Sequence, residues 1–474
     1  MDKNEIASGL RKLGLKKGDA VLLHGSLISL GHVEGGPDAV IDAFLETIGT
    51  EGTLLVPVFG ALGILTETLK KRPGAIISPC PRGTVAALGQ AAEELCRDHW
   101  HADTVHGTDT PYTRLAALGG YICLLGVDQD RNTTLHSVEA LLELPYLGNS
   151  TATFETPGGD TVTKTWKRYP GPHRDFIGLD RHFREAGALK TGRIGNAEVR
   201  LIKSRDLFDI ALALGRANPA FVLCDNPACA DCVRQRAALF ADRMEHESFT
   251  LSASSRLAGR YVPEIVDNLK AAGIRFVELD YLEGKACAFA APEKLRAAVQ
   301  EFEDNGISVS ALRAPAVPEN ISEWTDKLRS AGIRRLVLPL SEAPRCAEPM
   351  KAAGLEAVFY NTHQKTDTAV RLLKESAGAA CFNPANFVLA GEMPFLHSYR
   401  AGRFIKTIAQ LDLSDGIWDG APARLARGNA EIKELISILR CHYFGGCFCL
   451  GGGNLFPGTL KDAVGDFTRL LDRM

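Results

Sequence analysis

The sequence predicts an α/β protein with two domains, an N-terminal α/β domain over residues 1–245 and a C-terminal (β/α)8 barrel over residues 246–474. Three observations lead to this prediction. The chain has 474 residues, which is more than one ordinary hydrophobic core accommodates. Its first half joins short apolar runs to glycine-rich loops and helices. From Glu247 onward, strand-like runs alternate regularly with amphipathic helices.

Composition and charge narrow the classes of function. The chain is 45% hydrophobic and 23% charged, and its formal net charge is -3, with no long basic block. A dedicated nucleic-acid binder normally carries a basic surface, so no nucleic-acid partner is expected. The N-terminus shows no apolar signal-peptide core, and no apolar run reaches the ~18 residues of a membrane span. We therefore expect a cytoplasmic protein without a membrane partner, whose scattered cysteines are mostly reduced, buried thiols.

The N-terminal segment predicts a helix, a strand and a glycine-rich loop in succession. Residues 4–13 form the helix, residues 20–23 the buried strand, and residues 31–36 the loop, after which a second helix begins at Pro37. A loop of this kind presents backbone N–H groups and the positive end of the helix dipole, which suit a pyrophosphate. It lacks the spacing of a dinucleotide fingerprint or a P-loop. The alternative is a loop that merely turns the chain.

The stretch over residues 121–143 predicts a strand, a polar turn and the start of a helix. His136 and Glu139 are three residues apart, so on a helix they share one face. A neutral imidazole oriented by a carboxylate is a common general base, and Asp130 lies just upstream to help position the ring. The alternative is an exposed helix N-terminus in which His136 is an ordinary surface residue.

Several motifs occur in the order and spacing of one known family. The first comprises His24, Ser26, Leu27, Gly31, Val33, Gly35 and Gly36. The second comprises Gly52, Thr53, Leu54 and Pro57. The third comprises Asp130, Thr133, His136 and Glu139. Together they resemble the antibiotic (aminoglycoside 3-N) acetyltransferase family, and the resemblance extends over residues 10–223.

The resemblance implies an antibiotic-acetyltransferase-like α/β domain that uses acetyl-CoA as co-substrate. His136 would accept the proton of the substrate amine, and Glu139 and Asp130 would hold and polarise it. The amine would then attack the thioester in a ternary complex, without an acyl-enzyme. Thr133 would lie near the thioester. The CoA pyrophosphate and pantetheine arm would be held by Ser26, Leu27, Ser29, Gly35 and Gly36.

One motif departs from the family pattern. Where the family has RSxHPxxS, this chain keeps Ser78 but has Cys80 in place of the usual histidine. Ser78 and Cys80 are therefore candidates for the substrate pocket, and the alternative is that Cys80 only packs. The segment 151–179 is aromatic and is expected to shape the amine side. The alternative is a surface hairpin, because TPGGDTV reads as two strands about a Gly-Gly turn.

Three cysteines form the most suggestive metal-ligand spacing in the chain. Cys224, Cys229 and Cys232 follow a Cys-x4-Cys-x2-Cys pattern. A structural zinc site needs a fourth ligand, and the neighbouring sequence offers no second CxxC or HxxxH motif. The cluster is therefore a candidate for structural zinc or an Fe–S centre, and the alternative is three reduced thiols.

The second half contains eight strand-like runs, which begin near residues 249, 275, 307, 334, 356, 380, 404 and 445. Eight such units fit a (β/α)8 barrel. The segments GIRFVELDY (residues 273–281) and AQLDLSDG (residues 409–416) resemble the xylose-isomerase-like sugar isomerase and epimerase barrels. Asn361 and Asn383 stand near positions where that family has acidic metal ligands. We therefore expect no divalent-metal isomerase site. His363 and Asp412 are the best polar candidates for a substrate, and the alternative is that both are satisfied polar residues at the barrel mouth.

The leading hypothesis is an acetyl-CoA-dependent N-acetyltransferase. Its substrate would be a primary amine of an amino sugar, aminocyclitol or aminoglycoside-like small molecule. In this hypothesis the barrel binds substrate or assembles a homodimer. A second hypothesis is a bifunctional enzyme whose barrel isomerises or epimerises a sugar. A third is a non-catalytic binding or scaffold protein.

Overall fold

The computed structural model describes residues 1–60, 63–169, 173–401, 404 and 407–474. The chain divides into two compact units, Met1–Gln235 and Arg236–Met474. The division falls inside helix α10 (Ala230–Glu245), ten residues before the boundary expected from the sequence. Among the described residues, no helix is long and apolar enough to span a membrane.

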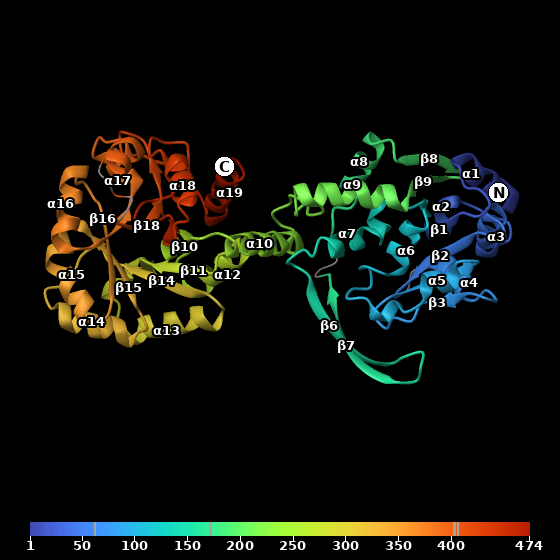
Figure 1. Cartoon of the computed structure of the whole chain (residues 1–474), viewed down its shortest axis with the longest axis horizontal. Coiled ribbons are helices and arrows are strands. Elements are labelled where there is room, and N and C mark those ends of the chain that lie inside the picture. Colours follow the sequence, from blue (N-terminus) through green and yellow to red (C-terminus); the bar gives the residue numbers. More distant parts are fainter. Residues whose placement is uncertain (61–62, 170–172, 402–403, 405–406) are drawn as a thin grey trace. The chain divides into compact units, whose positions relative to one another are not determined.

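The N-terminal unit is built on a mixed sheet of seven described strands in the order β3-β4-β2-β1-β5-β9-β8 (Figure 1). The central strand β1 pairs in parallel with β2 and β5, and the outer pairs are antiparallel. The strands are β1 (Ala20–Gly25), β2 (Thr53–Val58), β3 (Ile76–Ile77), β4 (Thr84–Gly89), β5 (Tyr121–Leu125), β8 (Leu189–Ile194) and β9 (Ala197–Lys203).

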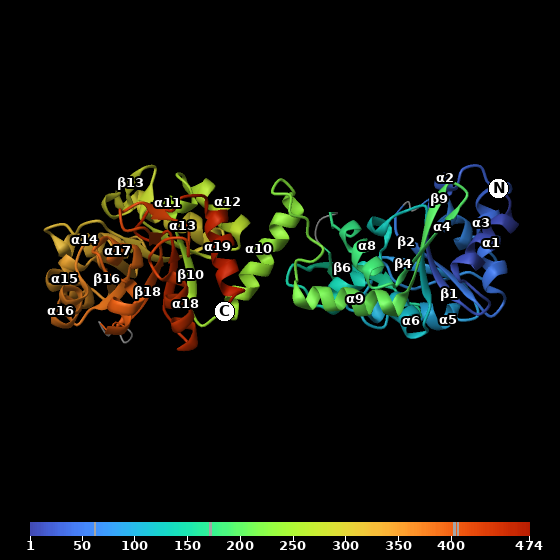
Figure 2. The same cartoon turned by 90° about the horizontal axis from the view of Figure 1, so that it is seen from above.

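Helices cover both faces of this sheet, because the residues of the buried strands point alternately to each side. Val21 and Leu23 of β1 join one core with α1 and α3, whereas Leu22 joins another with α5 and α6. Figure 2 shows α1 and α3 side by side. The helices are α1 (Lys3–Leu13), α2 (Leu27–Leu30), α3 (Gly36–Ile48), α4 (Ile64–Lys70), α5 (Ala92–Cys96), α6 (Pro111–Ala117), α7 (Leu135–Leu141), α8 (Asp180–Glu185) and α9 (Ser204–Ala217).

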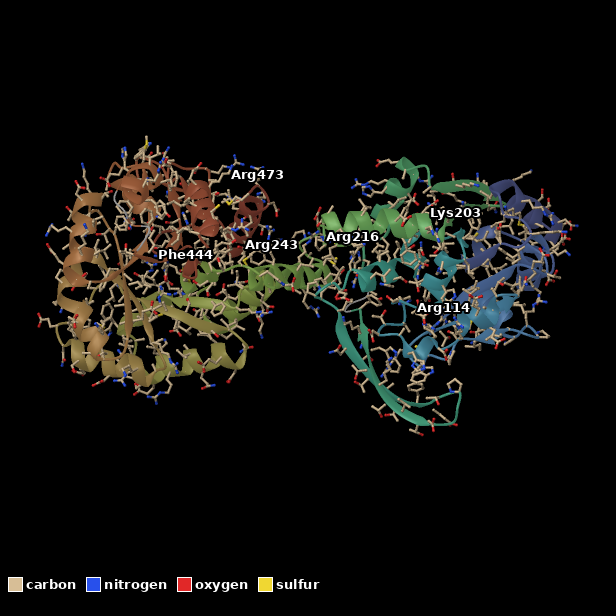
Figure 3. All side chains as sticks on the ribbon, in the orientation of Figure 1. Arg114, Lys203, Arg216, Arg243, Phe444 and Arg473 are labelled. Carbon is tan, nitrogen blue, oxygen red and sulfur yellow. The ribbon has the colours of Figure 1, made fainter. Side chains whose placement is uncertain are left out.

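Local sequence signals explain where these helices begin and end. Asp2 and Glu5 form a capping box at the start of α1, and Gly14 ends the helix with a φ of 110°. Figure 3 shows Lys203 and Arg216 at the two ends of α9. Arg216 stands in the last turn, where a positive charge stabilises the helix dipole.

A long two-stranded hairpin leaves the sheet between α7 and α8. Its strands β6 (Gly148–Glu155) and β7 (Thr161–Arg168) are antiparallel and in continuous register. The surface hairpin that TPGGDTV indicated as the alternative for this segment is present in the structure. The end of β7 is held by a hydrogen bond from the Lys167 N–H to the Asp103 carbonyl at 2.8 Å. This contact places one end of the hairpin beside the loop that follows α5.

Within the described part of the C-terminal unit, eight parallel strands close into a barrel. In barrel order they are β10 (Thr250–Ser254), β11 (Phe276–Leu279), β14 (Ser308–Arg313), β15 (Arg335–Pro339), β16 (Glu356–Tyr360), β17 (Ala379–Phe382), β18 (Ile408–Leu413) and β21 (Cys447–Leu450). Each coincides with a predicted strand-like run, so the prediction of a barrel is confirmed. Residues 405–406 of the seventh predicted run lie outside the described residues.

Helices lie between consecutive barrel strands along the chain, and two further antiparallel pairs are short. The helices are α11 (Ser255–Ala258), α12 (Val262–Ala272), α13 (Pro292–Asp304), α14 (Ile321–Ser330), α15 (Ala343–Ala352), α16 (Thr366–Ser376), α17 (Pro384–Leu389), α18 (Ile432–Cys441) and α19 (Leu460–Leu471). The short pairs are β12 (Tyr281–Leu282) with β13 (Lys285–Ala286), and β19 (Asp415–Gly416) with β20 (Pro422–Ala423).

Candidate active site

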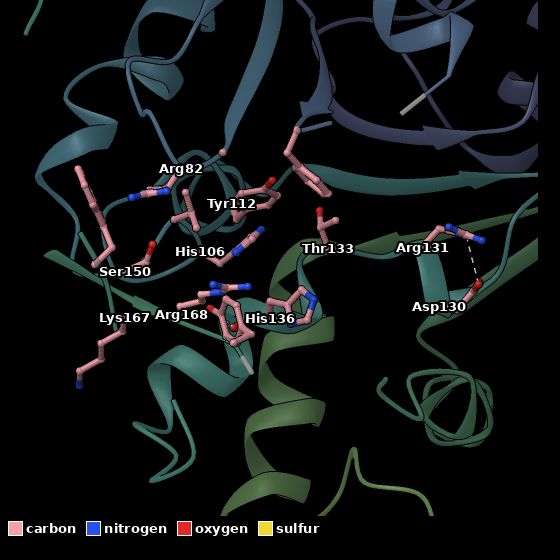
Figure 4. A pocket seen from close by; sticks show the side chains of 15 residues that line it. Arg82, His106, Tyr112, Asp130, Arg131, Thr133, His136, Ser150, Lys167 and Arg168 are labelled. Carbon is pink, nitrogen blue, oxygen red and sulfur yellow. Dashed lines mark hydrogen bonds and ion pairs between the residues drawn. The ribbon is translucent and has the colours of Figure 1, made fainter. Parts of the chain in front are cut away.

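A cavity of about 560 Å³ opens in the N-terminal unit between the segment after β5 and the β6–β7 hairpin (Figure 4). Aromatic and cationic side chains make up most of its wall. The lining residues are Phe59, Arg82, Gly83, Val105, His106, Tyr112, Asp130, Arg131, Thr133, His136, Ser150, Trp166, Lys167, Arg168 and Tyr169. A space of this size accommodates a small molecule.

His136 and Glu139 lie together on one face of α7. Nδ1 of His136 is 2.7 Å from Oε2 of Glu139. The Glu139 side chain is completely buried, whereas the His136 side chain remains 26% exposed and lines the cavity. The structure thus places an accessible imidazole against a buried carboxylate.

Two further side chains donate hydrogen bonds to the second oxygen of the Glu139 carboxylate, Oε1. The Tyr146 hydroxyl donates to Oε1 at 2.8 Å, and Nε of Arg174 donates to the same atom at 2.6 Å. Burial acts to raise the pKa of Glu139. The hydrogen bond and charge of His136 and the charge of Arg174 oppose it, so the pKa lies below its usual value. Glu139 is therefore ionised at neutral pH.

The ionised carboxylate fixes the tautomer of His136. A carboxylate only accepts hydrogen bonds, so Nδ1 of His136 carries the proton and donates it to Glu139. Nε2 then keeps its lone pair and is the atom free to accept a proton. This is the arrangement that a general base requires.

Aromatic rings surround the His136 imidazole. The Tyr169 ring centroid is 4.4 Å away and the Phe176 centroid 5.0 Å away. The Tyr169 hydroxyl also donates to the His136 carbonyl at 2.7 Å. A second histidine, His106, lies 5.5 Å from His136 between centroids, and burial lowers its pKa well below the usual value. His106 is consequently neutral beside the candidate base.

Asp130 and Thr133 also line the cavity, but neither is seen to hydrogen-bond to the His136 ring. The Asp130 carboxylate pairs with Nε of Arg131 at 3.2 Å, and Figure 4 shows this pair to one side of His136. Glu139, and not Asp130, therefore makes the hydrogen bond that orients the imidazole. Thr133 lies at the start of the turn into α7 and lines the cavity, while its hydroxyl oxygen is buried.

The residues proposed for CoA lie around the carboxyl end of β1 and outside the cavity wall. Ser26 follows β1, and Leu27 and Ser29 lie in α2, where the Ser29 hydroxyl donates to the Gly126 carbonyl at 2.8 Å. Gly35 and Gly36 have φ values of 78° and 61°, which favour glycine, and they begin the 13-residue helix α3.

Ser78 and Cys80 are buried outside the described cavity wall. The Ser78 hydroxyl contacts Nδ1 of His99 at 2.8 Å and accepts from the Val85 N–H at 2.9 Å. Cys80 is buried, and its burial raises the pKa of its thiol. Both side chains support the loop that carries Arg82 and Gly83 to the cavity.

The two polar candidates of the barrel occupy different environments. His363 is exposed in the segment after β16. Asp412 is buried in β18, where Nη2 of Arg313 lies 2.6 Å from its Oδ1, and Nε of Arg313 lies 2.6 Å from Oε1 of Glu278. A guanidinium thus stands between the two carboxylates.

The three cysteines of the metal-like motif converge in space, and a fourth side chain joins them. His173 completes a group whose ligand atoms all lie within 4.8 Å of one another, together with Cys224, Cys229 and Cys232. His173 lies 51 residues before Cys224 in the chain, so no local spacing indicated it. Tyr146 and Arg174 were also missed. Arg174 is 35 residues from Glu139, and only the fold brings the two together.

Comparison with known proteins gives matches to the N-terminal unit. The family profile described as aminoglycoside 3-N-acetyltransferase matches residues 22–62 and 59–214. The aminoglycoside N(3)-acetyltransferase VII of Streptomyces paromomycinus is 32% identical over 263 residues, covering 44% of this chain and 90% of its own. The aminoglycoside N(3)-acetyltransferase IX of Micromonospora chalcea is 31% identical over 261 residues, covering 44% of this chain and 92% of its own.

Solved structures of related proteins are similar to the same share of the chain. The aminoglycoside acetyltransferase AAC(3)-IVa, solved as a mutant in complex with apramycin, is 29% identical and has a TM-score of 0.44. It covers 49% of this chain and 98% of its own. AAC-IIIb, solved as a binary complex with CoASH, is 25% identical with a TM-score of 0.43, covering 46% of this chain and 97% of its own.

Proposed function

The chain belongs to the aminoglycoside 3-N-acetyltransferase family, and from this premise we propose that its N-terminal domain transfers the acetyl group of acetyl-CoA to a primary amine. Its class is that of an acyltransferase, more narrowly an N-acetyltransferase. The acceptor is a small molecule of the amino sugar, aminocyclitol or aminoglycoside type. The observation that carries the proposal is the hydrogen bond between His136 and the buried Glu139 at the edge of the cavity.

In the proposed reaction, the acceptor amine enters the cavity and Nε2 of His136 accepts its proton. The amine nitrogen then forms a bond to the thioester carbonyl carbon, the carbon–sulfur bond breaks, and CoA leaves with the thiol sulfur. Glu139 stabilises the imidazolium that forms, because its carboxylate is 2.7 Å from Nδ1. The products are an amide and CoA, and no acyl-enzyme is required.

The CoA moiety is proposed to lie at the carboxyl end of β1, along Ser26, Leu27 and Ser29, with its pyrophosphate near Gly35 and Gly36. Support comes from the start of α3, whose first N–H groups lack carbonyl partners within the helix and whose dipole favours an anion. The thioester then reaches toward Thr133, which lines the cavity together with His136.

A direct test replaces His136 with alanine and follows the release of free thiol from acetyl-CoA with a panel of amines. We expect His136→Ala to lower kcat by roughly 10²–10⁴-fold, as is typical for loss of a general base, while binding of CoA persists. The matched control is His442→Ala, because His442 is an exposed histidine of the other unit. Unchanged turnover in His136→Ala would exclude the proposed mechanism.

The charge of the cavity favours a particular kind of acceptor. Asp130 is already paired with Arg131, which leaves Arg82, Lys167 and Arg168 as the other charged side chains of the described wall. These cations repel a polycationic amine and attract an anion. We therefore propose, as a second candidate, an acceptor that carries a carboxylate or phosphate besides its amine.

For the C-terminal unit we propose a xylose-isomerase-like (β/α)8 barrel that binds a ligand or assembles a homodimer without metal chemistry. The support is the position of Arg313, whose guanidinium pairs with both Glu278 and Asp412. A divalent cation would compete with this buried positive charge for the same carboxylates. Stoichiometric manganese or magnesium bound to the barrel would argue for the bifunctional alternative.

A further inference from the structure

Four side chains with metal-binding atoms converge in the N-terminal unit, away from the wall of the cavity. Their ligand atoms, one from each side chain, all lie within 4.8 Å of one another. The group comprises His173, Cys224, Cys229 and Cys232 and is called the Cys3His cluster below. We propose that the Cys3His cluster is a four-coordinate structural zinc site.

The distances within the cluster suit a tetrahedral ion. Nδ1 of His173 lies 3.3 Å from Sγ of Cys232 and 3.5 Å from Sγ of Cys229. With Zn–S bonds of about 2.3 Å and Zn–N bonds of about 2.1 Å, tetrahedral angles put such nitrogen and sulfur atoms about 3.6 Å apart. A small rearrangement of side chains therefore suffices to close the site around zinc.

The ligand set is the one expected for zinc. Three thiolates and one neutral imidazole form a Cys3His set, which is closed to substrate and belongs to the structural class of zinc sites. Binding replaces the three thiol protons with the metal and releases them to solvent, leaving a net charge of -1 on the site. A tetranuclear Fe–S centre ordinarily uses four cysteines, so one zinc ion fits this set better.

The local backbone also favours a thiolate at Cys229. This residue immediately precedes α10, whose first N–H groups lack carbonyl partners within the helix. The positive end of the helix dipole at such a start favours a negatively charged thiolate.

The site would join three segments, of which the first is distant in the chain from the other two. His173 belongs to the segment after β7, Cys224 to the segment after α9, and Cys232 to α10. The first two segments already meet through a hydrogen bond from the Asp175 N–H to the Val222 carbonyl at 2.8 Å. Zinc would strengthen this junction, because it adds four metal–ligand bonds to that backbone hydrogen bond.

This junction carries a residue of the candidate active site. Arg174 follows His173 directly, donates from Nη1 to the His173 carbonyl at 2.7 Å, and donates from Nε to Glu139. By fixing His173, zinc would hold Arg174 against the carboxylate that orients His136. The zinc site itself does not rest on the proposed acetyl transfer, so the two hypotheses can fail separately.

The test begins with the full chain, purified after expression in zinc-containing medium. We expect elemental analysis to give about one zinc per chain, in line with a closed structural site. Replacing zinc with Co²⁺ should produce the visible bands and thiolate charge-transfer absorption of a tetrahedral cobalt–thiolate centre. A chain that lacks zinc and gives no such spectrum with Co²⁺ overturns the proposal, as does acid-labile sulfide with iron.

Variants assign the ligands. Cys229→Ser should weaken zinc binding by more than roughly 100-fold, since loss of even an outer-sphere partner costs 10–100-fold. His173→Cys should retain zinc in a four-sulfur site, with a shifted cobalt spectrum. Cys441→Ser is the matched control, because Cys441 is an exposed thiol of the other unit, and it should keep full occupancy. Equal zinc content in Cys229→Ser and wild type contradicts the assignment.

Discussion

Nε of Arg174 lies 2.6 Å from Oε1 of Glu139, and the two side chains are 2% and 0% exposed. A buried ion pair of this kind contributes little net stability by itself, but loss of one partner leaves a charge without compensation. Here the carboxylate also orients His136. The Arg174–Glu139 pair therefore connects the stability of the N-terminal unit to the geometry of the candidate base.

Replacing Arg174 with methionine should destabilise the N-terminal unit by about 3–5 kcal/mol at pH 7, because the Glu139 carboxylate stays buried without its cation. The pKa of Glu139 is lowered in the folded protein, so its contribution to stability is present above the unfolded pKa of about 4.3 and is lost as pH falls through the folded pKa. The difference between variant and wild type should consequently shrink toward acid pH. Urea denaturation at pH 7 and pH 3.5 measures it.

The matched control is Arg216→Met, because Arg216 is exposed at the end of α9 and its loss should change stability by less than about 0.5 kcal/mol. An Arg174→Met protein as stable as wild type at pH 7 would show that Glu139 does not depend on this arginine.

Glu139→Gln should lower kcat by about 10²-fold, since the negative charge that stabilises the imidazolium is gone. It should also destabilise the N-terminal unit, because Arg174 then stays buried without its carboxylate. The glutamine oxygen can still accept from Nδ1, so the orientation of the ring is largely kept. The KM for the acceptor should change less than kcat, because the lost charge acts on the imidazolium that forms during the reaction. Glu143→Gln, a position just after α7, serves as control. A kcat equal to that of the wild type would contradict this role of Glu139.

Much of the architecture followed from local sequence. The eight barrel strands were predicted, and the β6–β7 hairpin was recognised as an alternative, because alternation, glycine punctuation and turn residues are short-range signals. The i, i+3 spacing likewise brought His136 and Glu139 together, since both belong to one helix. The family resemblance added the residues proposed to bind CoA, and their role remains a prediction.

The remaining contacts depend on tertiary structure. Arg174 reaches Glu139 from the segment after β7, and His173 reaches the cysteines from the same segment. Arg313 and Asp412 are 99 residues apart and meet only because the barrel closes. No periodicity or motif spacing encodes such pairs, so the sequence alone did not place their members in contact.

In the barrel, Arg313→Met should be strongly destabilising at neutral pH, because Glu278 and Asp412 would remain buried without their shared cation. Burial already raises the pKa of Glu278, so its contribution to stability is greatest below the unfolded pKa and declines as pH rises through the folded pKa. The variant should therefore recover stability at mildly acid pH more than wild type does. Thermal melts at pH 7.5 and pH 5.5 test this, with exposed Arg371→Met as control.

Because the cavity is lined by cations, we expect their substitution to change the KM for the acceptor and not the KM for acetyl-CoA. Lys167→Gln and Arg168→Gln should each raise the KM for an acceptor that carries a carboxylate or phosphate by about tenfold, equivalent to loss of ~1.4 kcal/mol. The KM for acetyl-CoA should stay nearly constant, and Lys190→Gln, an exposed position on β8, should change neither. A rise in the KM for acetyl-CoA alone would instead assign these cations to the CoA phosphates. Efficient turnover of polycationic amines would contradict the anionic acceptor.

Buried histidines should make the N-terminal unit sensitive to acid. Burial lowers the pKa of His24 to about 3 and that of His99 to about 4. An unfolded histidine has a pKa of about 6.5, so each contributes stability that is present above this value and is lost as pH falls through the window toward the folded pKa. Each should add a slope of about 1.4 kcal/mol per pH unit between pH 6 and pH 5. Replacing His24 with phenylalanine removes one such group. The free energy of unfolding, measured by urea denaturation, should then depend less steeply on pH by that amount. Parallel pH curves for variant and wild type would show that His24 is protonated without cost in the fold.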